Sequence, residues 1–176
     1  MDNQSNNLKD FEQHAALKIQ ALATNLKNEL GASMQEGGPI AAINTCKIKA
    51  PEITNQLNDT DDIKIKRTSL RLRNLDNSPD DWEQKILLSF EEKLKSGASI
   101  EELAYSEEIS SNNTSTLRMM RAIPMQPVCL SCHGDKKTMD KGLISSLDIN
   151  YPNDLATGFS IGEIRGAFSV SKTINN

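Results

Sequence analysis

The chain is poor in the residues that most often build catalytic and metal sites. Its 176 residues contain two histidines, three cysteines and one tryptophan, and aromatic residues make up 4%. No apolar run approaches the length that spans a bilayer. The formal net charge of −4 argues against nucleic acid as a partner, because phosphate recognition needs a basic surface.

Three of the five cysteine and histidine side chains fall within one pentapeptide, Cys129-Leu130-Ser131-Cys132-His133. Two thiols three positions apart, followed at once by an imidazole, form the attachment signature of a c-type haem. Each thiol adds to one haem vinyl group, and the histidine becomes the proximal iron ligand. The motif therefore predicts haem c, covalently attached through Cys129 and Cys132, with His133 on the iron.

Two other chemistries use a Cys-x-x-Cys pair, namely thioredoxin-like redox sites and zinc sites. The chain has no second cysteine or histidine cluster to complete four zinc ligands. It also lacks the alternating strand and helix pattern that precedes the thioredoxin motif. Both readings fit the sequence less well than covalent haem.

The haem motif also implies a cellular compartment. Thioether attachment in bacteria is completed outside the cytoplasm, so we expect the periplasm or an equivalent lumen. Residues 1–7 are polar throughout, which predicts a disordered tail and no signal peptide. We therefore expect a mature or engineered fragment from which a leader or membrane anchor has been removed.

Hydrophobic periodicity predicts one compact α+β domain with an antiparallel sheet. Residues 8–54 are expected to form N-terminal helices, broken at Gly37-Gly38-Pro39 and ended or kinked at Pro51. Residues 55–176 are expected to form the sheet and the remaining helices. The predicted elements after the first two helices are a polar loop over 55–62, a strand over 63–70, a helix over 81–95, a hairpin over 102–124, a helix over 139–147 and a strand over 165–174.

The second axial position of the iron is left open by the residues alone. Cys46 is the third cysteine, although a small buried hydrophobe is its ordinary role. The other candidates are histidine and methionine side chains that solvent exposure or core packing would equally explain: His14, Met34, Met119 and Met120.

Haem propionates need cations or hydrogen-bond donors, and the porphyrin needs apolar walls. Arg67 and Arg71 share strand parity, provided that the strand continues that far. The other available arginines are Arg73, Arg118, Arg121 and Arg165. The candidate walls are aromatic residues for which core packing is an equally good explanation: Trp82, Tyr151, Phe159 and Phe168.

Several blocks in the correct order resemble the c-type haem-binding PAS-like domain family. The resemblance covers roughly residues 10–174 and implies a PAS-like sheet behind long N-terminal helices, a covalent haem, and His133 and Cys46 as axial ligands. That family occurs as single exported proteins and as the sensor part of bacterial signalling proteins. The blocks that carry it are 44–46, 50–53, 66–74, 77–83, 129–134 and 158–170.

A thiolate ligand favours ferric iron and a low potential, which suits a redox or small-ligand sensor better than a general electron carrier. An electron-transfer cytochrome is the alternative. Enzyme activity is not expected, because only His14 would remain as an acid–base histidine. The expected partners are haem and either a redox protein or a diatomic gas, with a homodimer through the first helix as a further possibility.

Overall fold

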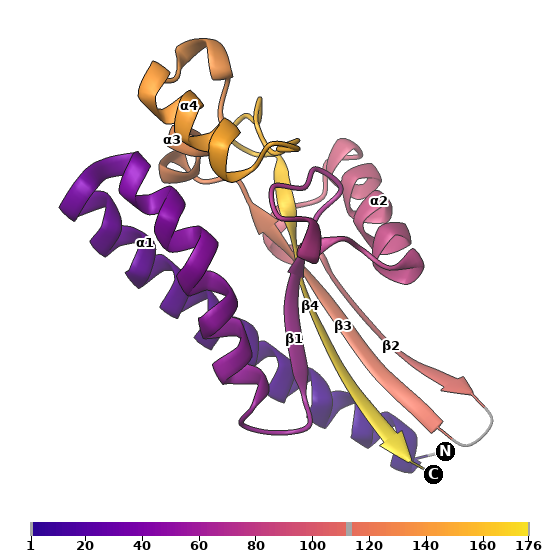
Figure 1. Ribbon diagram of the computed structural model, residues 1–176. Coiled ribbons are helices and arrows are strands. Elements are labelled where there is room, and N and C mark those ends of the chain that lie inside the picture. The colour runs from indigo at the N-terminus through magenta and orange to yellow at the C-terminus, as the bar shows by residue number, and fades with distance from the viewer. Residues whose placement is uncertain (1, 112–113, 176) are drawn as a thin grey trace.

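A four-stranded antiparallel sheet organises the structure, a computed structural model that describes residues 2–111 and 114–175 (Figure 1). Its strands are β1 (Lys64–Thr68), β2 (Ala104–Ser111), β3 (Thr114–Pro124) and β4 (Ile164–Asn175), and their order across the sheet is β1-β4-β3-β2. The last strand of the sequence therefore lies between the first and the third. The predicted α+β class with an antiparallel sheet is confirmed.

Alternation along the strands gives the sheet two apolar faces. One face carries Ile65, Leu117, Met119, Phe168 and Val170, which belong to a single buried cluster. The other face carries Met120, Ala122 and Ala167, which belong to a second cluster. Both faces therefore need a helical cover.

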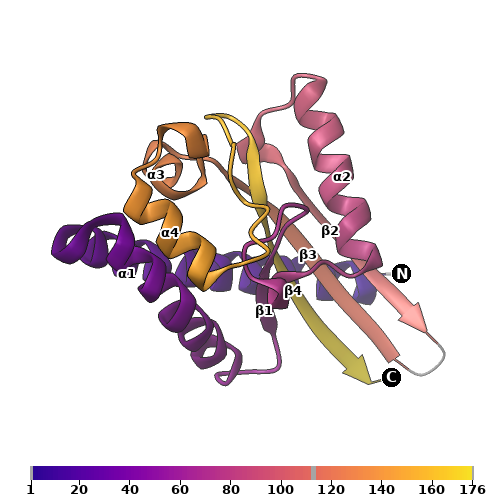
Figure 2. The same cartoon turned by 45° about the horizontal axis from the view of Figure 1, so that its top comes forward.

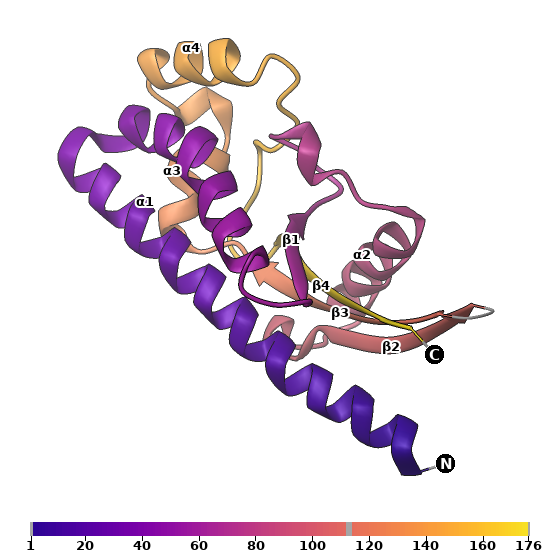
Figure 3. The same ribbon diagram turned by 60° about the horizontal axis from the view of Figure 1, so that its bottom comes forward.

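The first face is covered by α1 (Asp2–Asn58), which consists of two arms (Figure 3). Gly37 (φ −148°, ψ 15°) and Gly38 (φ 66°, ψ −162°) leave the helical conformation and reverse the chain, which confirms the predicted break. The hydroxyl of Ser33 donates a 2.7 Å hydrogen bond to the hydroxyl of Thr45 and so links the two arms. The arms contribute to the buried cluster through Phe11, Ala15, Ile19, Leu22 and Ile53.

Two boundaries of α1 differ from the prediction. The helix begins at Asp2, so it includes most of the segment expected to be a disordered tail, and Met1 lies outside the described residues. It also continues through Pro51 to Asn58, where a polar loop was expected from residue 55. Proline removes one backbone hydrogen bond, but burial of Ala50 and Ile53 against the sheet outweighs that loss.

The second face is covered by α2 (Asp81–Lys95), whose bounds agree with the predicted helix. Asp80 accepts the Glu83 backbone N–H at 2.8 Å, and the Glu83 carboxylate accepts the Asp80 backbone N–H at 2.9 Å. This reciprocal capping box begins the helix, and Leu87 and Phe90 are buried on its inner side. The sheet is thus enclosed between α1 and α2.

Residues 125–163 leave the sheet and form a separate lobe at one end of it (Figure 2). This lobe holds α3 (Leu130–His133) and α4 (Lys141–Asn150), and α4 packs against α1. The ammonium of Lys47 donates to the side-chain oxygen of Asn150 at 3.3 Å across this contact. The lobe therefore places the cysteine and histidine motif near the returning arm of α1.

Among the described residues, no helix is both long enough and apolar enough to cross a membrane.

Gly166 fixes how closely β4 approaches the end of β1. A Cβ at this position would overlap the carbonyl oxygen of Thr68 and lie 3.1 Å from the Cβ of Ser69. Gly166→Ala should therefore lower the free energy of unfolding by about 1 to 3 kcal/mol, measured by urea denaturation. Gly31→Ala is the matched control, because nothing lies within 4 Å of the added methyl group on α1, and it should be neutral or slightly stabilising. Equal stability of the two variants would contradict the packing argument.

Candidate functional site

The cysteine turn, residues 127–133, is a short, tightly wound segment. A 3₁₀ turn (Pro127–Cys129) runs directly into α3 (Leu130–His133). The backbone N–H of Gly134 closes the turn with a 2.9 Å hydrogen bond to the carbonyl of Leu130. Any side chain at Gly134 would crowd that same oxygen, since a Cβ would lie 2.7 Å from it. The sequence Cys-His-Gly thus suits a helical turn that must end abruptly.

The two cysteines of this turn are free thiols that pack on different sides. Cys132 packs against the cluster of Ile43, Leu143 and Leu147, which joins α1 to α4. Cys129 packs against a second cluster, made by Met125, Ala156 and Phe159. The turn is therefore held between two small apolar clusters, and both sulfurs stay half-buried.

His133 is held in one tautomer. Its Nδ1 lies 2.6 Å from the carbonyl oxygen of Ala156. A carbonyl can only accept, so Nδ1 carries the proton and Nε2 keeps a free lone pair. Burial, reinforced by the nearby charges of Arg165 and Arg73, lowers the pKa of His133 well below its ordinary value. A neutral imidazole with a free Nε2 is the form that binds a metal.

The 151–159 loop runs beside the cysteine turn and is bonded to it. The backbone N–H of Gly158 donates to the carbonyl of Gly134 at 2.7 Å, and that of Phe159 donates to the carbonyl of His133 at 2.9 Å. The Phe159 ring also meets the His133 imidazole edge to face, with centroids 6.2 Å apart. The loop therefore supports the imidazole from its backbone and from one aromatic side chain.

Arg73 joins this loop to the cysteine turn. Its Nη2 donates to the carbonyl of Cys132 at 2.6 Å, to Asp154 Oδ2 at 2.9 Å and to the carbonyl of Ala156 at 3.2 Å. The side chains of Arg73 and Asp154 are 11% and 2% exposed, so this is a buried ion pair. Through Nε and Nη2, Arg73 is bonded both to the cysteine turn and to the 151–159 loop.

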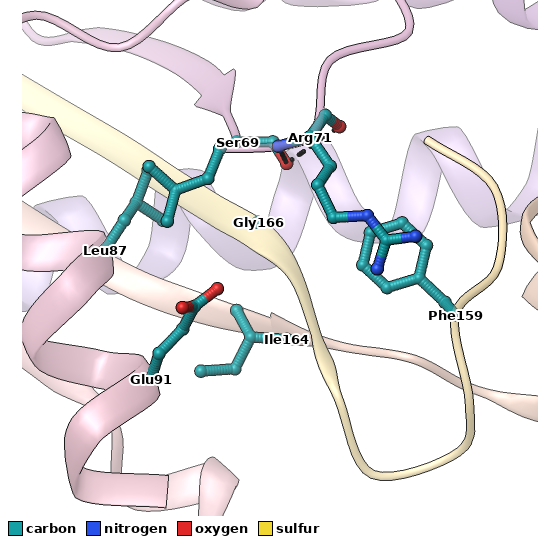
Figure 4. A pocket seen from close by; sticks show the side chains of 8 residues that line it. Ser69, Arg71, Leu87, Glu91, Phe159, Ile164 and Gly166 are labelled. Atoms are coloured by element: carbon teal, nitrogen blue, oxygen red, sulfur yellow. Dashed lines mark hydrogen bonds between the residues drawn. The ribbon is translucent and has the colours of Figure 1, made fainter. Parts of the chain in front are cut away.

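Arg71 is committed to the same loop. Its guanidinium donates to the carbonyl of Thr157 and lies 3.6 Å from the centroid of the Phe159 ring. Figure 4 shows the Arg71 guanidinium over this ring. β1 ends at Thr68, so the strand parity that paired Arg71 with Arg67 does not extend this far. The hollow lined by Arg71, Phe159 and Glu91 has about 10 Å³, enough for about one water molecule and far too little for a porphyrin.

Arg67 differs from Arg71 and Arg73 in that its guanidinium is not bonded to a neighbouring loop. It lies opposite Phe168 in the β1–β4 register and shares the face of Ile65, which is the face that α1 covers. Within residues 2–111 and 114–175, its guanidinium has no hydrogen-bond or ion-pair partner, whereas Arg71 and Arg73 have several. Burial lowers the pKa of Arg67, and the nearby Cys46 and Tyr151 oppose that shift.

Cys46 lies on the returning arm of α1 and faces this cation. Its thiol is accessible to solvent, although the surrounding protein raises its pKa and the charges of Arg67 and Arg73 partly offset the increase. Burial raises the pKa of Cys132 and of Tyr151, and the nearby Cys46 contributes to both increases. Ile43, one helical turn earlier, belongs to the cluster that Cys132 contacts. The structure thus brings Cys46, Arg67, Cys132 and Tyr151 together.

Trp82 is not brought to this site. It begins α2 on the opposite face of the sheet, where its ring lies 4.1 Å from the Arg118 guanidinium and its indole N–H donates to Glu107. The sequence makes Trp82 a candidate wall of a haem pocket, but α2 packs it against β2 and β3 instead. Trp82 serves the core instead.

Three of the alternative axial ligands, His14, Met119 and Met120, lie elsewhere as well, and Met34 is half-buried on the first arm of α1. His14 is exposed on the first arm of α1, and its Nδ1 lies 2.7 Å from the carbonyl of Asp10. Met119 and Met120 are buried in the clusters on opposite faces of the sheet. Phe168 is also a core residue, in the cluster under α1.

Sequence reasoning missed Asp154 and gave Arg73 no special place. Asp154 follows Tyr151-Pro152-Asn153 and is ordinary turn chemistry in the sequence. Arg73 is one of six arginines considered for a propionate. Their pairing is visible only once the fold brings the two loops together.

Comparison with known proteins agrees with this architecture. Residues 3–172 match the Tll0287-like family. Among solved structures, the chain is similar to a protein described as the cyanobacterial heme-protein Tll0287, with 22% identity, a TM-score of 0.59, and coverage of 99% of this chain and 96% of that chain. At this identity the structural likeness shows a shared fold. A search of curated proteins finds no match. Because the family match spans nearly the whole sequence, the chain belongs to the Tll0287-like family.

Proposed function

We propose that the protein binds a c-type haem through the cysteine turn. The observation that carries the proposal is His133, a neutral imidazole with its Nδ1–H bonded to Ala156 and its Nε2 lone pair free. Two free thiols, Cys129 and Cys132, precede it in the attachment spacing. The family match, and the haem that the similar solved protein is described as carrying, support the same cofactor.

The residues present fit such a group. Cys129 and Cys132 would each add the S–H bond across one vinyl group, with the sulfur and the hydrogen going to its two carbons. His133 and Cys46 would be the axial ligands, one from the cysteine turn and one from α1. Arg67 would pair with a propionate, because its donors have no other partner among the described residues. Tyr151 and Phe159 would supply apolar walls.

A bound haem supplies a one-electron redox centre, and a thiolate ligand holds its potential low. We propose that this centre acts as a sensor of redox state or of a small diatomic ligand, in the periplasm or an equivalent lumen. The placement of Cys46 supports sensing, because the ligand sits on α1 while the attachment residues sit in another lobe. A change at Cys46 would therefore reach a helix that covers the sheet.

An electron-transfer cytochrome remains the alternative function, with a redox protein as its partner. Catalysis is not part of the proposal, because His14 is exposed on the first arm of α1 and its ring bonds to its own helix backbone. His14 is therefore not placed to act as an acid–base residue beside His133.

Replacement of the thiol tests the second axial ligand. Cys46→Ser should shift the Soret and visible bands and raise the midpoint potential, because a weaker donor stabilises ferric iron less. A rise of about 59 mV corresponds to a tenfold change in the ferric–ferrous equilibrium. Lys49→Ala on the same arm is the control, since Lys49 pairs only with Glu52 on the surface. Spectra identical to wild type would eliminate Cys46 as a ligand.

Covalent attachment can be tested separately from ligation. After acid–acetone extraction, wild-type protein and Cys46→Ser should keep their haem, whereas the double variant Cys129→Ala, Cys132→Ala should lose it entirely. Each single variant should keep one thioether and show a shifted pyridine haemochrome band. Haem retained by the double variant would refute attachment through this motif.

The sensor and carrier roles differ in whether the reduced protein binds a diatomic gas. Carbon monoxide or nitric oxide added to ferrous protein should displace Cys46 and change the visible spectrum within the mixing time of the experiment. If the spectrum of the ferrous protein does not change with either gas, but the protein exchanges electrons rapidly with a small redox dye, the carrier role is favoured instead.

A further inference from the structure

We propose that Arg73 and Asp154 are positioning residues that fix the orientation of His133 and tune how strongly its imidazole donates electrons. This inference rests on the proposed function, in which His133 is an iron ligand. It adds two residues that neither the motif nor the family match assigns to the site.

The first step concerns the guanidinium of Arg73. Its Nη2 has two hydrogens and three acceptors, so the acceptors compete for them. The bonds to Cys132 O and Asp154 Oδ2 are 2.6 and 2.9 Å, and the bond to Ala156 O is the longest at 3.2 Å. The Nε of Arg73 adds a 3.2 Å bond to the same Asp154 oxygen. Arg73 is thus tied to the cysteine turn and to the 151–159 loop at once.

The second step concerns the backbone of Ala156. Its N–H donates to Asp154 Oδ1 at 2.8 Å, and its carbonyl accepts the Nδ1–H of His133 at 2.6 Å. Ala156 is fully buried, so solvent does not compete for either group. Asp154 therefore bonds to the N–H of the residue whose carbonyl accepts from the imidazole, and the same carboxylate also pairs with Arg73.

The third step is electronic. The carbonyl of Ala156 receives the His133 Nδ1–H on one side and the Arg73 cation on the other. A nearby cation draws electron density from the carbonyl and weakens it as an acceptor. A weaker acceptor leaves the imidazole less basic, because hydrogen bonding at one ring nitrogen raises the basicity of the other. The ion pair thereby sets the donor strength of Nε2.

Opposite effects follow for the two partners. Without the Arg73 cation, the Ala156 carbonyl accepts more strongly, the imidazole donates more, and ferric iron is favoured. Without the Asp154 charge, the guanidinium is no longer compensated and polarises the carbonyl more, so ferrous iron is favoured. A purely structural role would lower stability in both variants and would give no such difference in sign.

The experiment compares Arg73→Gln and Asp154→Asn in the haem-loaded full chain, with the midpoint potential and the ferric electron paramagnetic resonance spectrum as readouts. Arg73→Gln should lower the potential and Asp154→Asn should raise it, each by a threefold or larger change in the ferric–ferrous equilibrium, and both should alter the g values. The amide in Asp154→Asn keeps an oxygen for the Ala156 N–H, so this variant disturbs the fold least and decides the question if Arg73→Gln fails to load haem.

Asp148→Asn is the matched control. Asp148 forms an exposed 3.1 Å pair with Lys136 in the same lobe but touches neither His133 nor the 151–159 loop, so it should leave both readouts unchanged. Unchanged midpoint potentials in Arg73→Gln and Asp154→Asn would overturn the proposal. A change in potential with constant g values would also overturn it, because the loss of a distant charge alone would have that effect. His133→Ala separates the two levels: unchanged g values in that variant would refute histidine ligation itself, whatever Arg73 and Asp154 do.

Discussion

Three segments that are far apart in the sequence meet at the buried ion pair between Arg73 and Asp154. One is the chain after β1, one is the cysteine turn, and one is the 151–159 loop. A four-residue helix such as α3 is too short to hold its own shape. Desolvating an ion pair is costly unless further hydrogen bonds satisfy both groups. Here the carbonyls of Cys132 and Ala156 accept from Arg73, and the backbone N–H of Ala156 donates to Asp154. The cysteine turn is therefore held in place by Arg73 and the 151–159 loop, which bond to the turn and to each other.

The sheet separates this site from a second polar network. On the face under α2, the buried Glu83 carboxylate pairs with Lys66 at 2.9 Å and with Arg118 at 3.4 Å, and Arg118 lies over the Trp82 ring. That network caps α2 and secures it to the sheet. The candidate site instead lies at one end of the sheet, where the lobe of residues 125–163 packs against α1. The structural network and the candidate site are therefore separate.

Local signals in the sequence predicted the elements that depend on local interactions. The Gly37-Gly38 break, the helix over Asp81–Lys95 and the cysteine turn each rest on residues within one or two turns. The helix across Pro51 was missed because its stability comes from burial against a sheet that lies later in the chain. The same limit applies to the site. The hydrogen-bond partners of Arg71 and Arg73, and the lack of any for Arg67 among the described residues, depend on which distant segments the fold brings beside each side chain. Trp82 was assigned by residue type, which carries no information about the sheet face that a helix covers. Asp154 has no signal at all until the fold places Ala156 beside His133.

The reversal at Gly37-Gly38 has a consequence for the entropy of the site. The cysteine turn spans a few residues, whereas Cys46 reaches it only because the chain doubles back at Gly37-Gly38 and then forms β1, β2 and β3 before residue 129. Bringing these two parts of the chain together costs loop-closure entropy. Burial of the core that includes Phe11, Leu22 and Val170 offsets this cost, so cofactor binding does not have to. A cofactor that arrives at such a site encounters distant groups that are already ordered, so its own binding free energy is not spent on ordering them.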